Sequence, residues 1–363
     1  RRFDLAGFAM MAVALTAFQL MLDRGTQEDW LASREIWIYL LLCTSAAWMA
    51  VIHFATAPAP MFERALFADR NFTIALGFMI VIGLVMFAVM WNLLAGYAGL
   101  VSVGQQAFIG LGGYALIRLV DAGLPPFLMI FVAAILTGAV AWLLSWFVLR
   151  MKAGEFAIAT WVIAETIRSL VMFDPIVQGE TGTSLLALNA YDPDLRRLVL
   201  YLLALASMVV MVWGTWVLLQ RRIGAESQAI RDDEDAAASV GISTFRVKQR
   251  IYVIAAIGCA LAGALWLASA ITFQPRTSFG VQWSVFMLFM VLVGGIGTFI
   301  GPILGALVFF GLQELFGDFG AWYLAGVGGL AIFFALYLPN GIVGLWLDRG
   351  KDEPLSLRKR LRM

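Results

Sequence analysis

Long apolar runs separated by short polar stretches follow one another along most of the chain. A helix needs roughly 20 consecutive apolar residues to cross the hydrocarbon core of a bilayer, and the sequence supplies such runs repeatedly. They lie near residues 3–22, 37–56, 72–94, 98–120, 124–149, 154–173, 197–219, 251–271 and 321–346. Each run predicts a membrane helix.

The apolar block at 283–316 is too long for one straight span. As a single helix at about 1.5 Å per residue it would extend about 50 Å, against a hydrocarbon core of about 30 Å. Small residues and a proline interrupt its centre, and these can break a helix or let two helices pack closely. They are Gly294, Gly295, Gly297, Gly301, Pro302 and Gly305. We therefore predict two shorter helices in this block.

The run at 98–120, with the residues just before it, is unusually rich in small and polar side chains. It brings together Asn92, Gly96, Tyr97, Gly99, Ser102, Gly104, Gln105 and Gln106. Irregular backbone at membrane depth is tolerated only inside the protein or beside a water-filled path. The segment is therefore either broken or re-entrant and lines a translocation path, or it is a helix whose small residues give close packing. A full crossing would place Arg1 and Arg2 outside, and a return would place them inside.

The composition agrees with a membrane protein and excludes several other classes. Of the 363 residues, 62% are hydrophobic and 13% are charged, and the mean hydropathy is +0.87. These values exclude a soluble enzyme, a disordered chain and a disulfide scaffold, and a net charge of +1 gives no support to nucleic-acid binding. The predicted fold class is all-α: a polytopic integral membrane helical bundle of about 10–11 membrane segments in lipid, one of them broken or re-entrant.

Reactive side chains are scarce. Cys43 and Cys259 both lie in apolar runs, and His53 is the only histidine of the sequence. This set predicts no disulfide, no metal site and no histidine-based catalysis. The sequence also lacks the phosphate-binding P-loop motif, so we expect no ATP hydrolysis by that route. With one histidine and two scattered cysteines, we expect no other enzymatic activity either.

Basic residues are concentrated in one loop and at the C-terminus. Six lysines and arginines lie in the loop 220–250, and six more lie in the tail 347–363. Because cytoplasmic loops are enriched in these residues, we expect both segments to be cytoplasmic. The expected organisation is N-terminal membrane helices at 1–71, a core at 72–346 that includes the loop 220–250, and a basic cytoplasmic tail.

The loop 220–250 contains a pattern typical of a short surface helix. Residues 229–240 have acidic side chains near their start, and Gly241 follows as a helix stop. The candidate docking residues of this helix are Arg231, Glu234, Asp235, Ala236, Ala237 and Gly241. A solvated loop without a partner is the alternative.

Glu165 and Arg168 lie in the middle of the apolar run at 154–173. An acidic side chain at that depth is costly and should face the bundle or a cavity. The two residues are three positions apart and share a helix face. They either form an internal ion pair that stabilises the bundle, or line a polar path together with Thr160.

Taken in order, these motifs resemble the membrane permease subunit of ABC importers for branched-chain amino acids. The resemblance rests on Asn92–Tyr114, Phe156–Thr160 with Glu165 and Arg168, Ala229–Gly241, Gly294–Ala306 and Pro339–Trp346. Two positions depart from the family pattern: Gln105 stands where a histidine is frequent, and Thr183 stands in place of the second glycine of a Thr-Gly-Gly loop.

The resemblance implies a permease subunit of the bacterial inner membrane that works by alternating access and binds no cofactor itself. It implies a second homologous permease, two cytoplasmic ATPase subunits that carry ATP and Mg, and a periplasmic or extracellular substrate-binding protein. Residues 229–241 would then form the coupling helix. Branched-chain or related small hydrophobic amino acids would be the substrates, with urea or short amides as an alternative. An ion-gradient-driven secondary transporter is a further alternative, with Glu165 as its candidate ion site.

Overall fold

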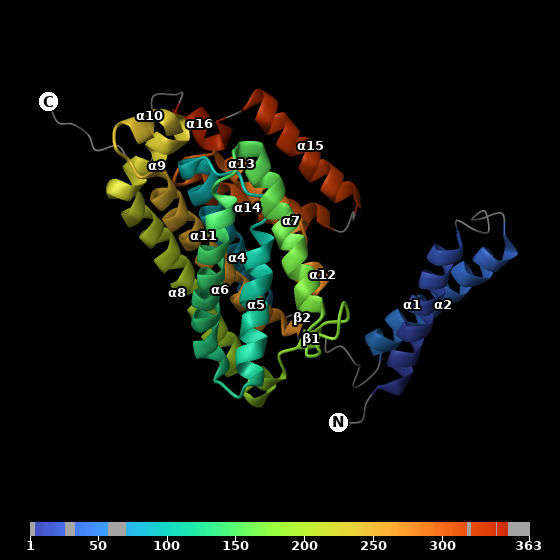
Figure 1. Cartoon of the computed structure of the whole chain (residues 1–363). Helices are drawn as coiled ribbons and strands as arrows, with labels where there is room; N and C mark the ends of the chain where they lie inside the picture. The colour runs from blue at the N-terminus through green and yellow to red at the C-terminus, as the bar shows by residue number, and fades with distance from the viewer. Residues whose placement is uncertain (1–3, 26–32, 57–69, 318–320, 339, 348–363) are drawn as a thin grey trace. The chain divides into compact units, whose positions relative to one another are not determined.

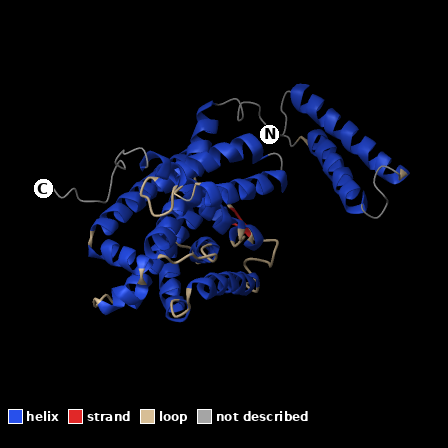
Figure 2. Cartoon of the chain, turned by 90° about the horizontal axis from the view of Figure 1, so that it is seen from above, coloured by secondary structure: helices blue, strands red, loops and turns tan. Residues whose placement is uncertain are grey.

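The computed structural model describes residues 4–25, 33–56, 70–317, 321–338 and 340–347. Figure 2 shows that nearly all of this chain is helix, which confirms the predicted all-α class. A single short pair of strands interrupts it, in which β1 (Thr183–Ser184) runs antiparallel to β2 (Thr272–Phe273). The chain divides into two compact units, residues 1–76 and 77–363.

The first unit contains two helices, α1 (Leu5–Gly25) and α2 (Arg34–Thr56). Arg24 pairs with Glu35 at 3.0 Å where one helix ends and the next begins. At the opposite ends, Nε2 of His53 lies 2.9 Å from the carboxylate of Asp4. Contacts at both ends show that α1 and α2 form an antiparallel helical hairpin (Figure 1).

The second unit begins within α4 (Arg70–Asn92) and contains the other helices of the described chain (Figure 1). In chain order they are α5 (Gln106–Asp121), α6 (Pro126–Val148), α7 (Ala153–Met172), α8 (Pro193–Gln220), α9 (Arg222–Asp232), α10 (Glu234–Ser239), α11 (Thr244–Ala270), α12 (Pro275–Ser278), α13 (Gln282–Gly294), α14 (Gly301–Phe316), α15 (Ala321–Tyr337) and α16 (Gly341–Leu347). Every apolar run predicted from the sequence overlaps at least one helix of the two units. Of the predicted tail 347–363, residues 348–363 lie outside the described residues.

Six helices of the described residues are long and apolar enough to cross a membrane. The spans are Met79–Tyr97, Pro126–Val148, Pro193–Gln220, Thr244–Ala270, Pro275–Gly294, which takes in α12 and α13, and Tyr323–Gly344, which takes in parts of α15 and α16. Two shorter apolar helices, Ala9–Met21 and Gly301–Phe316, add to them. The predicted break in the block at 283–316 is confirmed, because α13 ends at Gly294 and α14 begins at Gly301. The protein is therefore a multi-pass membrane protein.

Helix α11 lies at the centre of the second unit, and most of its residues are buried. Small residues let it approach α5 closely. A Cβ added to Gly263 of α11 would overlap the carbonyl oxygen of Ile109, and one added to Gly112 of α5 would overlap that of Ala260. Close backbone approach of this kind is how membrane helices gain packing energy without help from water.

The two ends of the second unit are distinguished by what they contain. We call the end that carries α9 and α10 the coupling end; there the amide of Gln249, near the start of α11, donates to Ser145 Oγ near the end of α6 over 2.8 Å. We call the other end the far end. It carries the β1–β2 pair, which ties the loop after α7 to the residues after α11.

The segment between α4 and α5 is broken. Residues 93–97 form a π-helical turn, and residues 99–105 have no regular structure before α5 begins. Gly96 accepts a hydrogen bond from Arg231 at the coupling end, whereas Arg118, near the end of α5, pairs with Asp174 of the far end. The segment therefore crosses the bundle, and it does not return to the end at which it began.

Candidate functional site

The surface segment at the coupling end is two helices and not one. Asp233 between them has an extended backbone (φ −158°, ψ 110°), and its carboxylate accepts a 2.9 Å hydrogen bond from the amide of Ala236. An aspartate in this position caps the helix that follows it, so the single helix predicted over 229–240 is wrong. The predicted stop is confirmed, since Gly241 has φ +88° and follows the end of α10.

Helix α10 is anchored on one side and exposed on the other. Ala237 is buried in a small cluster with Ile230 of α9 and Val247 of α11. Nζ of Lys248 lies 2.5 Å from the carboxylate of Glu234 and adds an ion pair to the start of α11. On the opposite side Asp235 and Ala236 are exposed, and Val240 is 76% exposed. An exposed surface on an anchored helix is suited to contact another protein.

Arg231 joins this surface segment to the broken membrane segment. Its Nη1 donates to the carbonyl oxygen of Gly96 over 2.8 Å, while Nε and Nη2 both bond the carboxylate of Asp232. Gly96 lies in the π-helical turn that ends α4. Such turns are departures from regular helix that occur frequently at functional sites.

Asn92 joins the same turn to the glycine-rich loop between α13 and α14. Its amide group donates to the carbonyl oxygen of Thr298 and accepts from the amide of Gly297, both over 2.9 Å. We call Asn92, Gly96, Arg231, Gly297 and Thr298 the coupling junction. It connects three parts of the chain that are far apart in sequence.

The glycine-rich loop is packed so closely that its glycines leave no room for larger side chains. A Cβ on Gly294 would overlap the carbonyl oxygen of Gly301, and one on Gly305 would overlap that of Met290. Pro302 occupies the first turn of α14, where its missing N–H has no intrahelical partner to lose. The remaining predicted glycine, Gly295, lies in the same loop with a positive φ. The predicted break and packing residues therefore lie together where α13 and α14 meet, next to the coupling junction.

A second group of predicted residues lies where the irregular stretch 99–105 meets α7. The amide of Val103 donates to Thr160 Oγ1 over 3.3 Å, and a Cβ on Gly104 would overlap the carbonyl oxygen of Thr160. Ser102 is buried, and its carbonyl oxygen accepts from the indole of Trp91. Tyr97, just before this stretch, is also buried.

Gln105 and Gln106 follow directly and are fully buried, each with 0% exposure. The amide oxygen of Gln106 accepts a hydrogen bond from Ser284 Oγ of α13. The amide nitrogen of Gln106 and both amide atoms of Gln105 have no hydrogen-bond partner among the described residues. Buried polar atoms without partners are rare in proteins and call for an explanation.

Glu165 and Arg168 lie apart from both groups. Arg168 Nε lies 3.3 Å from the carboxylate of Glu165, so the predicted ion pair is present. The pair lies on a half-exposed face of α7, beside the exposed side chains of Trp161 and Val162. The predicted role of these two residues in a translocation path is not supported by any contact with Gln105 or Gln106, and it stays a prediction.

One polar cluster at the far end was not anticipated from the sequence. The hydroxyl of Tyr114 donates to the carboxylate of Asp174 over 2.6 Å, the amide of Ile176 donates to it over 3.0 Å, and Arg118 lies 3.3 Å away. The hydrogen bond from the Tyr114 hydroxyl has the largest effect in holding the pKa of Asp174 below its ordinary value. The hydrogen bond from the Ile176 amide and the charge of Arg118 lower this pKa further. The available signal was the spacing of Tyr114 and Arg118, which places them on one face of α5.

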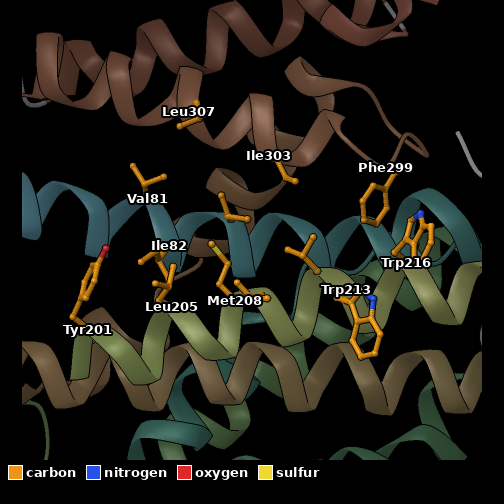
Figure 3. A pocket seen from close by; sticks show the side chains of 13 residues that line it. Val81, Ile82, Tyr201, Leu205, Met208, Trp213, Trp216, Phe299, Ile303 and Leu307 are labelled. Carbon is orange, nitrogen blue, oxygen red and sulfur yellow. The ribbon is translucent and has the colours of Figure 1, made fainter. Parts of the chain in front are cut away.

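An apolar groove of about 690 Å³ lies among α4, α8 and α14. Figure 3 shows Tyr201 at one end of it and Trp213, Trp216 and Phe299 at the other. Its remaining lining is aliphatic or thioether and includes Val81, Ile82, Leu205, Met208, Ile303 and Leu307. Such a surface is complementary to hydrocarbon and not to a polar solute. The polar part of the site therefore lies elsewhere, at the broken segment.

The sequence model of the branched-chain amino acid transport system permease component matches residues 72–337, which contain both the coupling junction and the glutamine pair. The chain belongs to this family. Within the family it is 28% identical over 280 residues to the high-affinity branched-chain amino acid transport system permease protein LivM of Escherichia coli, covering 69% of this chain and 65% of that protein. It is 29% identical over 279 residues to LivM of Salmonella typhimurium, with the same shares of both chains.

Another protein to which the chain is similar is named for a different substrate. The fructose import permease protein FruG of Bifidobacterium longum is 25% identical over 267 residues, which cover 69% of this chain and 78% of that protein. The chain spans 65% of the length of the two LivM proteins. No solved structure matches it.

Proposed function

We propose that this chain is the transmembrane subunit of an ATP-driven ABC importer in the bacterial inner membrane, which translocates branched-chain or related small hydrophobic amino acids by alternating access. Membership of the permease family and the names of the LivM proteins support this class. The observation that carries the mechanism is the bond from Arg231 to Gly96. It joins an exposed surface segment directly to the broken membrane segment.

The junction offers a route for transmitting movement. Two cytoplasmic ATPase subunits, which hold ATP and Mg, would push on α9 and α10 as they close. Arg231 would carry that displacement to Gly96, and Asn92 would carry it to the loop between α13 and α14. Residues 99–105 have no regular helix to break, so a small shift there can reorient α5 relative to α13.

The surface of α10 fits the docking role. Its buried side is fixed by Ala237 and Lys248, so force applied to Asp235 or Val240 is passed into the bundle. The coupling end also carries the arginines of the loop 220–250, which supports a cytoplasmic position for it. A second homologous permease and an external substrate-binding protein would complete the importer.

Docking is tested by co-purifying the chain with its two ATPase subunits. A charge placed at Val240 would be buried without a partner in the interface, so Val240→Asp is expected to reduce recovery of the ATPase subunits about tenfold. Leu124→Asp is the matched control, because Leu124 is an exposed apolar residue in the loop between α5 and α6. Equal recovery with both variants would overturn the docking assignment.

The energy source is tested in vesicles. Leucine is expected to accumulate only with the ATPase subunits, ATP and the binding protein present. Uptake by this chain alone under a proton or sodium gradient would overturn the proposal in favour of a secondary transporter. The pairing of Glu165 with Arg168 counts against that alternative, because the charge of its candidate ion site is already balanced by a neighbour on the same helix.

A further inference from the structure

The start of α5 contains three side-chain amide atoms that have no hydrogen-bond partner in the part of the chain that the structure describes. They belong to two consecutive residues, Gln105 and Gln106, neither of which has any exposed surface. Burying an amide without a partner costs free energy, and at membrane depth no bulk water repays the cost. An apolar side chain of similar size would avoid this cost. A buried amide that is kept without a partner therefore points to a role in function.

The two glutamines lie deep in the bundle, among three helices. Gly104 is packed against Thr160, which lies seven residues after the start of α7, and α7 starts at the coupling end. Gln106 bonds Ser284, which lies ten residues before the end of α13, and α13 ends at the coupling end. At about 1.5 Å per residue, these positions are about 10–15 Å from the coupling end, which is close to the middle of a hydrocarbon core about 30 Å thick. An unwound segment followed by a helix N-terminus at that depth is a recurrent arrangement for binding polar solutes.

The surroundings of the pair carry no net charge. Lys248 is the only charged residue among the buried ones of the described chain, and it is paired with Glu234 at the coupling end. The buried polar side chains near the pair are the hydroxyls of Ser102, Thr160 and Ser284. Neutral groups cannot offset a net charge at this depth, so a ligand bound here must be neutral overall.

An apolar surface adjoins the polar one. Phe108 follows Gln105 by three residues, and Phe156 precedes Thr160 by four, so each shares a helix face with its polar neighbour. Both rings pack edge-on against Tyr252 of α11, at centroid distances of 5.6 and 6.3 Å. The site therefore combines unpaired amide groups with an aromatic surface.

We propose that Gln105 and Gln106, at the N-terminus of α5, form the binding site for a zwitterionic amino acid with an apolar side chain during its passage. The helix N-terminus and the amide nitrogens would bind its carboxylate, and the amide oxygen of Gln105 would accept from its ammonium group. The aromatic surface would contact its side chain. In this structure the site is closed, and separation of α5 from α13 would open it. The inference rests on the proposed function.

The decisive variant is Gln105→Met, which keeps the length of the side chain and removes its unpaired amide. If the amide serves the ligand, the variant protein melts at the same or a higher temperature, while the KM for labelled leucine rises about tenfold in the assembled importer. Gln249→Met is the matched control: it removes a bonded amide, so it is expected to lower the melting temperature and leave the KM unchanged. Unchanged leucine uptake by Gln105→Met, or a melting temperature lowered as in the control, would overturn the inference.

A second measurement separates this inference from the proposed function. Cells producing the complete importer are offered labelled leucine, lysine, glutamate, fructose and urea one at a time. Uptake of leucine alone among these supports a site for neutral zwitterions. ATP-dependent uptake of fructose, urea, lysine or glutamate in place of leucine would overturn the inference and leave the ABC permease class standing, whereas uptake that needs no ATPase would overturn the proposed function.

Discussion

Nη1 of Arg231 donates to the carbonyl oxygen of Gly96 over 2.8 Å, across a sequence separation of 135 residues. Arg231 belongs to an amphipathic surface helix, and Gly96 belongs to the turn that ends a membrane helix. Because the other guanidinium bonds go to Asp232, the group is held by its own helix while it contacts the membrane segment. The contact is the direct link between the surface that would meet an ATPase and the segment that would move.

Replacing Arg231 should therefore uncouple the two parts. We expect Arg231→Met to lower leucine uptake about tenfold or more while ATP hydrolysis by the assembled complex continues. The partly exposed hydrogen bond should cost only about 1 kcal/mol of stability. Arg222→Met is the control, since Arg222 is exposed and pairs with Glu226 of the same helix. Uptake reduced equally in both variants would contradict a specific role for the Gly96 contact.

Asn92 should contribute to the stability of the folded protein through its two hydrogen bonds. Asn92→Leu removes two hydrogen bonds and leaves the amide of Gly297 and the carbonyl of Thr298 without that partner. We expect a loss of about 3 kcal/mol of stability, measured as a lower melting temperature in detergent. Asn189→Leu, at an exposed asparagine that accepts from Arg196, should change the melting temperature far less. If the two variants melt alike, the junction does not depend on Asn92.

The contribution of the Glu165–Arg168 ion pair to stability can be measured by comparing the melting temperatures of three variants. Glu165→Leu leaves a guanidinium without its partner on α7, which we expect to cost about 1 kcal/mol. Glu165→Leu combined with Arg168→Leu removes both charges and should restore the melting temperature. Glu155→Leu, at an exposed residue that caps the start of α7, is the control. A double variant less stable than Glu165→Leu alone would show that Arg168 has a role apart from this pair.

Asp174 should make the far end sensitive to acid. Its lowered pKa means that the folded state favours the carboxylate. The resulting stability is complete above the ordinary aspartate pKa of about 3.9 and is lost as the pH falls through the lower, folded value. We expect the melting temperature of the wild-type protein to fall in that acidic range. Asp174→Asn should be less stable than the wild type at neutral pH, and its melting temperature should depend less on pH in the acidic range. The two pH profiles can be compared by thermal melting between neutral and acidic buffers, and parallel profiles would refute the assignment.

Much of the helix layout could be predicted because the period and length of apolar runs reflect the bilayer directly. The break between α13 and α14 followed from glycines and a proline in one block, and the ion pair of Glu165 with Arg168 followed from a spacing of three. The single helix predicted over 229–240 was wrong, because the chain forms two helices that are separated at Asp233. From the sequence, Asp233 could lie inside one continuous helix or cap the start of a second helix. In the structure it caps α10, whose Ala237 packs against Val247.

By itself, the sequence determined that this is a multi-pass helical membrane protein with a charged surface segment, because local composition sets which residues can lie in hydrocarbon. Only the tertiary structure decided which of its polar residues act together. Asn92 and Gly96 were predicted with Gln105 as one path, yet the fold places them beside Gly297 and Arg231 and leaves Gln105 with Gln106 deeper in the bundle. Hydrogen-bond partners more than 100 residues apart cannot be assigned from a local pattern, because they depend on how whole helices pack.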